Sequence, residues 1–410
     1  MSSPALGQVV RRSEGAAGRA QRAATFAAFV SHGLLFASWT AHIPQVKDHL
    51  GLSDATLGLA LLGAPLGSVV AMLVVARMLP RLGSPRMVQV TLLGYCLAGP
   101  LVGLAGSFAA LVAALFSWGA FQGALDVSMN TQAVTVERAA AQPLMSGFHG
   151  GWSIGAFAGA GIGTLGVAAG IPLTPQLLLL AVPVLAAAGL LSRRMLADPP
   201  PLAAKPHTHG PGIEQVRTGR IVVRLSGPVL ILGSIAFASM LCEGASADWA
   251  SVYLRASVGV TAAWAGLGYT AFSLAMVIVR LMGSRLLTRL SPRRLLPALA
   301  GVGAAGFVGG LLGGVSVTVI AGFACLGVGL ALVIPSVNSA AGRLPGISQG
   351  TAIAMVSACG WAGFVFGPPI IGGLASASSL TAALVILPVL TACIAVAIGR
   401  ARALHVTPSG

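Results

Sequence analysis

Residues 81–86 read Arg81-Leu-Gly-Ser-Pro-Arg86, and residues 289–294 read Arg289-Leu-Ser-Pro-Arg-Arg294, so a short basic turn recurs at an offset of 208 residues. Three further matches agree at this offset: Gly58 with Gly266, Asn130 with Asn338, and the pair Gly155 and Gly159 with Gly363 and Gly367. Agreement at one fixed offset indicates a duplicated unit. The chain is therefore predicted to contain two related halves.

The sequence around these turns is strongly apolar. Of the 410 residues, 56% are hydrophobic and 8% are charged, and the mean hydropathy is +0.90. These values exclude an ordinary soluble domain. A membrane-spanning helix needs about 20 apolar residues, and we expect twelve such helices at 23–44, 55–79, 86–106, 108–134, 144–168, 176–192, 227–251, 262–286, 295–314, 316–336, 350–372 and 380–399.

The predicted fold is all-α and integral to the membrane, with two six-helix bundles in parallel repeat. We expect a cytoplasmic N-terminal tail (1–22), an N-terminal bundle (23–192), a cytoplasmic linker (193–226), a C-terminal bundle (227–400) and a cytoplasmic tail (401–410). The paired glycines serve packing within one chain as readily as between chains, and we expect a monomer.

The placement of charge predicts the orientation. The formal net charge is +15, and of the 24 Lys and Arg residues only Lys47 and Arg255 fall on the side away from the termini. This asymmetry follows the positive-inside rule and places both termini in the cytoplasm of a bacterial inner membrane. A nucleic-acid partner is not needed to explain the charge.

Three segments resemble a known family. They are Gly123-Ala-Leu-Asp-Val-Ser-Met-Asn130, Gly147-Phe-His-Gly-Gly-Trp-Ser153 and Ala247-Asp-Trp-Ala-Ser-Val-Tyr-Leu254. Together with the repeated loop and the long middle linker, they resemble the major facilitator superfamily (MFS), in particular its MosC-like and fucose-permease-like bacterial branch. The resemblance implies a central cavity lined by helices one, four, seven and ten, and transport of a small solute.

The repeated turn departs from the family pattern. The family usually has an acidic residue just before the first arginine, where this chain has Pro80 and, in the second copy, Thr288. The candidate gating residues of the two loops are Arg81, Arg86, Arg289 and Arg293. The antiporter pattern of helix five is absent, which favours symport or uniport.

A polar stripe follows one face of the fourth predicted helix. Trp118, Gln122, Asp126 and Asn130 recur every four residues and so share a face. A charged residue at membrane depth costs roughly 2.5 to 3.5 kcal/mol on insertion scales, so this face is expected to point inward. Gln122, Asp126 and Asn130 are candidate substrate or coupling residues; the alternative is a hydrogen-bonded seam between helices.

The second half offers a second carboxylate and an arginine. Glu243 is a candidate proton carrier in helix seven, because an apolar bundle favours the neutral form of a carboxylate. Arg280 in helix eight is either a counter-charge for a substrate carboxylate or a residue that snorkels to the cytoplasm. We expect Asp248 to lie at the membrane interface, paired with Arg255 and involved in gating or folding.

Histidines, tryptophans and one asparagine complete the candidate set. Histidine can relay protons near neutral pH, and tryptophan offers flat faces that stack on sugar rings. Packing and interface anchoring are the alternatives for both types. The residues are His32, Trp39, His149, Trp152, Asn338 and Trp361.

The sequence shows no pattern that requires an enzyme. Gly151-Trp-Ser-Ile-Gly155 matches a hydrolase elbow only by its letters, because it lies within an apolar helix. No P-loop and no HExxH pattern occurs, so we expect no cofactor and no metal. The hypothesis is secondary transport by alternating access, coupled to protons or another ion. An exporter of drugs or metabolites, and a membrane receptor or scaffold that transports nothing, stay open as alternatives.

Overall fold

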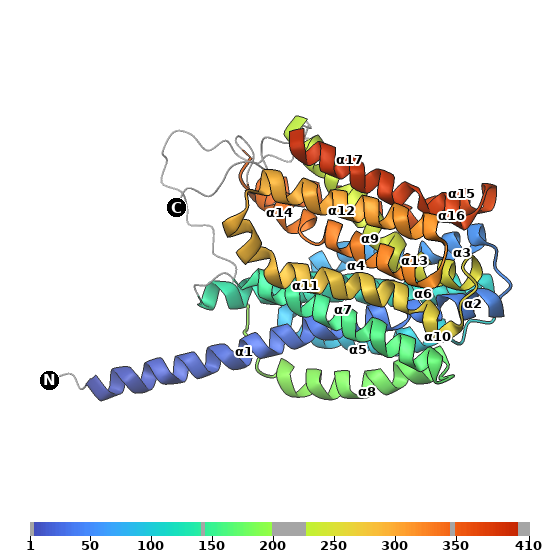
Figure 1. The fold of residues 1–410 in the computed structure, drawn as a ribbon. Coiled ribbons are helices and arrows are strands. Elements are labelled where there is room, and N and C mark those ends of the chain that lie inside the picture. The colour runs from blue at the N-terminus through green and yellow to red at the C-terminus, as the bar shows by residue number, and fades with distance from the viewer. Residues whose placement is uncertain (1–3, 141–143, 199–226, 345–348, 401–410) are drawn as a thin grey trace, which may run out of the picture.

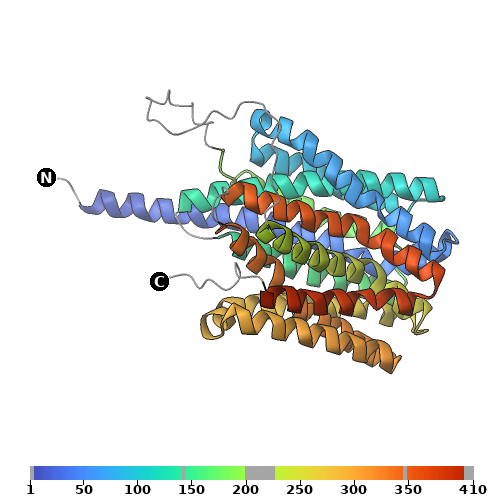
Figure 2. The same cartoon turned by 90° about the horizontal axis from the view of Figure 1, so that it is seen from above.

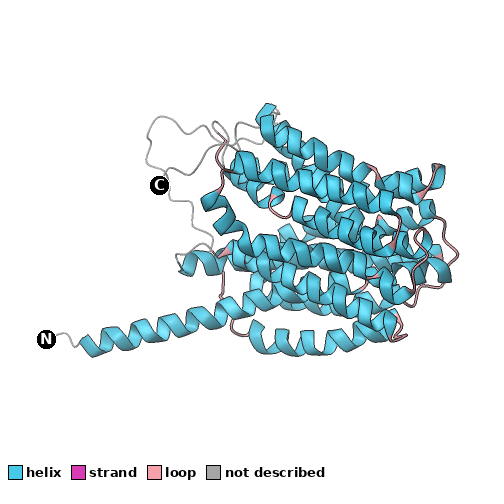
Figure 3. Cartoon of the chain, viewed as in Figure 1, coloured by secondary structure: helices cyan, strands magenta, loops and turns pink. Residues whose placement is uncertain are grey.

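The computed structural model describes residues 4–140, 144–198, 227–344 and 349–400. Every regular element within these ranges is a helix (Figure 3). The predicted linker beyond residue 198 and the predicted C-terminal tail lie outside the described residues. The helices, in chain order, are α1 (Pro4–Ser38), η1 (Thr40–His42), α2 (Ile43–His49), α3 (Asp54–Leu61), α4 (Gly63–Leu82), α5 (Ser84–Val102), α6 (Phe108–Ala140), α7 (Met145–Ala168), α8 (Leu173–Ser192), α9 (Gly227–Ala256), α10 (Ala262–Ala265), α11 (Leu267–Arg289), α12 (Pro292–Gly313), α13 (Ser316–Leu330), α14 (Val333–Ala341), α15 (Gln349–Ala377), α16 (Leu380–Leu384) and α17 (Ile386–Arg400).

These elements form twelve consecutive helical passes, because five of the passes consist of more than one helical segment. These passes are α1 with η1 and α2, α3 with α4, α10 with α11, α13 with α14, and α16 with α17. Within the described residues, ten helical segments are long and apolar enough to cross a membrane. The shorter or more polar α5 and α8 supply the third and sixth passes. The chain is thus a multi-pass membrane protein, as the hydropathy predicted.

Prolines explain three of these interruptions. Pro65, Pro335 and Pro388 lie four residues after Leu61, Ala331 and Leu384, and one helical segment ends at each of these residues or at the residue before it. Proline has no N–H, so the carbonyl four residues earlier loses its helical partner. In a membrane such a carbonyl must be satisfied by other protein groups or by water.

The two halves pack in the same way. In the first half α1 contacts α7 and α8, and α6 contacts α4 and α5; in the second half α9 contacts α15 and α17, and α13 contacts α11 and α12. These pairs are equivalent when the passes are numbered one to six and seven to twelve. Figures 1 and 2 show the blue-to-green helices gathered on one side of the molecule and the yellow-to-red helices on the other.

Glycines set the closest approaches between helices. A Cβ on Gly155, Gly159 or Gly163 of α7 would fall on the backbone carbonyl of Val30, Leu34 or Ser38 of α1. The second half repeats this contact, because a Cβ on Gly363 of α15 would fall on a carbonyl of α9. Small residues let helix backbones approach closely in lipid, where van der Waals packing is a main attraction between helices.

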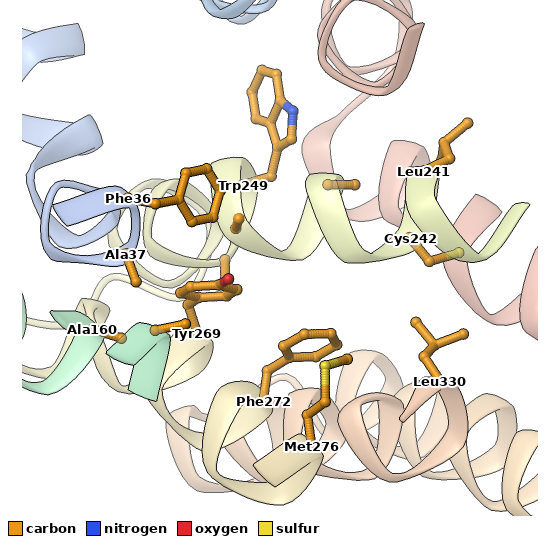
Figure 4. Close-up of a cluster of buried hydrophobic side chains, with 14 of the residues drawn as sticks. Phe36, Ala37, Ala160, Leu241, Cys242, Trp249, Tyr269, Phe272, Met276 and Leu330 are labelled. Carbon is orange, nitrogen blue, oxygen red and sulfur yellow. The ribbon is translucent and has the colours of Figure 1, made fainter. Parts of the chain in front are cut away.

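The apolar core extends across both halves. One cluster of buried apolar side chains includes Phe36 and Ala37 of α1 together with Trp249 of α9 and Tyr269 and Phe272 of α11 (Figure 4). Trp249 and Phe272 are among the largest fully buried side chains. The halves are therefore joined by side-chain packing as well as by the chain itself.

The α1–α7 contact yields a direct test. We expect Gly159→Leu to reduce the yield and thermal stability of the folded protein, because the side chain would strike the α1 backbone; overpacking typically costs about 1–3 kcal/mol, and a backbone contact yields less readily than a side chain. Gly161→Leu in the same helix is the control, since nothing lies within 4 Å of a Cβ there. Fluorescence-detected size exclusion and melting of both variants check this. Equal stability would show that the close contact is not required.

Candidate functional site

A small cavity lies between the two halves near the middle of the molecule. Its volume is about 30 Å³. It is lined by Phe36 of α1 and Trp39 directly after it, Leu61, Ala64, Pro65 and Ser68 of α3 and α4, Leu115, Trp118 and Gln122 of α6, Asp248 of α9, and Trp361, Phe364 and Pro368 of α15. Three sequence-predicted site residues, Trp39, Gln122 and Trp361, are brought together here.

Two expectations about this region were wrong. The walls come from passes one, two, four, seven and eleven, whereas pass ten was expected in place of two and eleven. Asp248 is not interfacial; its exposed fraction is 8% and it lines the cavity. Arg255 instead donates a hydrogen bond to the carbonyl of Val260 at 3.2 Å. The depth of Asp248 was misjudged because α9 continues to Ala256.

Aromatic rings form a continuous series around the cavity. The indole of Trp118 lies edge-on to Trp39 at 6.0 Å between ring centroids and stacks on Tyr95 at 5.3 Å. Tyr95 lies 5.6 Å from the ring of His32. On the other side, Phe36 lies 6.0 Å from Trp152 and 6.3 Å from Phe364, which in turn lies 6.0 Å from Trp361. The series therefore draws on α1, α5, α6, α7 and α15.

One hydrogen bond closes this series. The indole N–H of Trp152 donates to Nδ1 of His32 at 3.0 Å. Since Nδ1 accepts, the neutral ring has its proton on Nε2. Among the described residues, His32 Nε2, Tyr95 Oη and Trp118 Nε1 are buried without a hydrogen-bond partner. These three atoms belong to α1, α5 and α6 of the first half, and of the three residues Trp118 alone lines the cavity.

The polar stripe of α6 continues from the cavity towards the ends of the helices that hold the chain termini. Asn130 donates through Nδ2 to the carbonyl of Asp126 at 2.8 Å and to its Oδ1 at 3.2 Å. Both residues are half-buried. The equivalent stretch in the second half has Leu326, Leu330 and Ile334 in place of Trp118, Gln122 and Asp126. Asn130 alone has a polar counterpart, Asn338, so the rest of the polar face belongs to the first half.

Arg280 connects both halves and three helices. Its Nη1 donates to the hydroxyl of Ser153 on α7 at 2.7 Å, and its Nη2 lies 3.8 Å from a carboxylate oxygen of Glu243 on α9. Its Nε donates at 3.1 Å to the carbonyl of Ala331. Of the two roles that the sequence left open, the structure places Arg280 inside the bundle, with 19% of its side chain exposed.

The bond to Ala331 has a local cause. Pro335 has no N–H to offer this carbonyl, so pass ten breaks between α13 and α14. The guanidinium of Arg280 supplies the missing donor. A side chain in another pass thus stabilises the broken helix, as the lipid environment requires.

The remaining candidates lie further out. His149 is exposed, contacts Phe29 edge-on at 5.3 Å, and lies close enough to Arg280 for their charges to interact. Asn338 is half-buried on α14, away from the aromatic series. The four candidate gating arginines are exposed at the helix ends that flank the two loops; they are Arg81, Arg86, Arg289 and Arg293.

A carboxylate from elsewhere in the chain contacts the first of the two repeated loops. Asp198, which follows α8, accepts hydrogen bonds from the backbone N–H of Ser84, from the hydroxyl of Ser84 at 2.6 Å and from the hydroxyl of Thr135 at 3.1 Å. Ser84 is the first residue of α5, so Asp198 caps this helix and meets the positive end of its dipole. The loop thus has an acidic partner although its own position 80 is proline.

Several members of this region carry no signal in the sequence that marks them as functional. Tyr95, Phe36 and Phe364 resemble ordinary core residues, and Ser153 is one serine among many. The Gln122 to Asn130 stripe was found because its four-residue spacing is visible in the sequence. No comparable signal marks partners such as Trp152 and His32, which are 120 residues apart.

Comparison with known proteins identifies the family. The family model of the Major Facilitator Superfamily matches residues 24–348 and 232–409. The chain belongs to the major facilitator superfamily. An MFS-type transporter of Yersinia pestis whose function is uncharacterised is 34% identical over 368 residues, covering 89% of this chain and 92% of that protein. Membrane protein MosC of Rhizobium meliloti is 31% identical over 377 residues, covering 91% and 89%.

Solved MFS structures share the fold at low sequence identity. The nucleoside transporter NupG aligns with a TM-score of 0.72 at 11% identity, covering 93% of this chain and 99% of that one. A D-xylose–proton symporter aligns at 0.70 and 11%, covering 92% and 96%. FucP aligns at 0.61 and 17%, covering 94% and 99%. The predicted MFS fold and the resemblance to MosC and FucP are thereby confirmed.

The support that Arg280 gives to the broken helix can be measured as a coupling free energy between Arg280 and Pro335 in a double-mutant cycle. We expect Arg280→Ala to lower the melting temperature, because it leaves the Ala331 carbonyl and the Glu243 carboxylate unpaired. In a Pro335→Ala background the loss in free energy of unfolding should be smaller by about 1 kcal/mol, since the alanine introduced there has the backbone N–H that proline lacks and can donate it to Ala331.

Pro65→Ala is the matched control, because it restores a backbone N–H at a different helix interruption, the one between α3 and α4. The effect of Arg280→Ala should be unchanged in that background. The same loss of stability in all three backgrounds would contradict the proposed support of the Ala331 carbonyl.

Proposed function

We propose that this MFS protein is a proton-coupled secondary transporter of a small solute with several hydroxyl groups, such as a sugar or a nucleoside, and that it works by alternating access. The observation on which the proposal rests is the cavity between the two halves, which is lined by the rings of Trp39, Trp118 and Trp361 together with the polar groups of Gln122 and Asp248. Proteins of similar fold include a nucleoside transporter and a D-xylose–proton symporter.

The chemistry of the cavity favours this class of solute. Trp39, Trp118 and Trp361 present flat apolar faces suited to the C–H surfaces of a sugar ring. Gln122 and Asp248 add polar groups within the same cavity. Only one formal charge, that of Asp248, lines it, so a neutral solute fits better than a strongly anionic one.

The need for a conformational change follows from the cavity volume. A cavity of about 30 Å³ holds one or two waters and no sugar. Contacts between the halves gather at the end away from the start of α1 and the end of α17 (Figure 1). They include Ala55 N–H to Ser376 Oγ at 2.9 Å, Thr164 to Thr270 at 3.2 Å and Ser251 to the carbonyl of Thr40 at 2.6 Å. Binding of solute would therefore accompany separation of the halves at one end.

The orientation and the coupling groups complete the proposal. Both termini lie on the cytoplasmic side of a bacterial inner membrane, as the positive-inside rule indicates. Asp126 and Glu243 are the proposed proton carriers. Asp126 is bonded to neutral Asn130, whereas Glu243 faces Arg280. Asp126 is the primary carrier because a neutral amide favours the charged form of a carboxylate less than an arginine does. The chain is proposed to act as a monomer, with the solute and the proton as its partners.

Proteoliposomes with an internal pH indicator test this proposal. Sugars, polyols, nucleosides and amino acids are added outside in turn, and we expect at least one sugar or nucleoside to acidify the interior. Asp126→Asn should reduce this signal at least tenfold, because an amide cannot take up a proton. Glu243→Gln should reduce it less, since Gln still offers Arg280 a hydrogen-bond acceptor.

Asp48→Asn is the matched control, because Asp48 is exposed near the end of α2. Its signal should equal that of the wild type. Unchanged flux in both Asp126→Asn and Glu243→Gln would contradict the coupling role. Alkalinisation instead of acidification would indicate exchange and favour an exporter.

A further inference from the structure

A second concave region lies on the outside of the second half. It is a groove of about 480 Å³ between α9, α15 and α17, and it shares no residue with the central cavity. Its walls are apolar and include Leu230, Phe237, Cys359, Cys393 and Ala397. Cys393 and Leu230 are exposed, so the groove opens on the side that would face lipid.

The repeat explains why this groove exists. At the offset of 208 residues, Gly233 and Ser234 stand where the first half has Thr25 and Phe26. In the first half the ring of Phe26 covers Gly151, and a Cβ there would lie 2.6 Å from that ring. The second half has lost both larger side chains.

The one polar side chain in the groove is already satisfied. Ser234 donates its hydroxyl to the carbonyl of Leu230 at 2.8 Å. It therefore presents little polarity to a ligand. A ligand of this groove has to be apolar along its length.

The positively charged side chain of Arg400 lies close in sequence to one end of the groove. Val229 is in the first turn of α9, and Ala397 is in the last turn of α17. Arg400, the last residue of α17, is exposed one turn beyond Ala397. A cation at a helix end beside an apolar groove matches an anionic lipid headgroup above an acyl chain.

We propose that this groove binds an anionic phospholipid of the leaflet on the side of the chain termini, with one acyl chain between α9 and α17 and the phosphate on Arg400. The leaflet is the cytoplasmic one in the orientation proposed above. A concave seam between three helices suits a flexible chain, whereas helices of two copies would associate through a flat stripe of small residues.

Native mass spectrometry of the purified full chain tests the proposal, with phosphatidylglycerol and phosphatidylcholine added separately. The wild type should retain one phosphatidylglycerol in preference to phosphatidylcholine. Ser234→Phe, which restores the residue of the first half, should abolish this retention. Arg400→Gln should lower the preference for the anionic lipid by about fivefold, the effect of one cation at a membrane surface.

Leu312→Phe is the control for Ser234→Phe, because Leu312 is 83% exposed and lies on α12, outside the groove. It should bind phosphatidylglycerol like the wild type. Equal retention in Ser234→Phe and the wild type would overturn the proposal. A dimer that is lost in Ser234→Phe would also overturn it, by assigning the groove to a second copy.

A second measurement uses the wild-type protein alone, so it does not depend on the folding of any variant. Phosphatidylglycerol with a photoreactive group in its acyl chain should label peptides from α9 and α17 of the wild type in vesicles. Labelling spread evenly over all lipid-facing helices would contradict a specific groove.

Discussion

A backbone carbonyl without a hydrogen-bond donor is unfavourable inside a bilayer. In this protein Arg280 satisfies such a carbonyl, that of Ala331. Pro335 removes the donor for Ala331, and Arg280 replaces it at 3.1 Å. The same guanidinium reaches Ser153 in the first half and Glu243 in the second. A single side chain therefore ties a broken helix, a buried carboxylate and the contact between the halves to one position.

The aromatic series depends on the same region. Trp152 precedes Ser153 on α7, and both line a small space with Glu243 and Tyr269. Trp152 also donates a hydrogen bond to His32. A shift of Arg280 relative to α7 would therefore change the positions of the aromatic rings that contact Trp152. This chain of contacts gives a physical route by which protonation of Glu243 would alter the site proposed to bind solute.

Much of the fold follows from the sequence for identifiable reasons. The passes are visible because lipid imposes about 20 apolar residues on each, and the paired glycines at 155, 159 and 363 are visible because the repeat aligns them. The stripe from Gln122 to Asn130 is visible because it is local. The burial of Asp248 and the choice between two roles for Arg280 were not predictable, since both depend on helix lengths and on partners distant in sequence. Asp198 replaces a missing acidic residue from more than 100 positions away, so no local motif reports it.

The central claim is that the two halves separate at the end where they now meet. Electron–electron double resonance between spin labels at Ala55 and Ser376, with the native cysteines replaced, measures this directly. We expect a short distance and a second, longer one, with proportions that change with pH in the wild type but not in Asp126→Asn. A single short distance at every pH would contradict it.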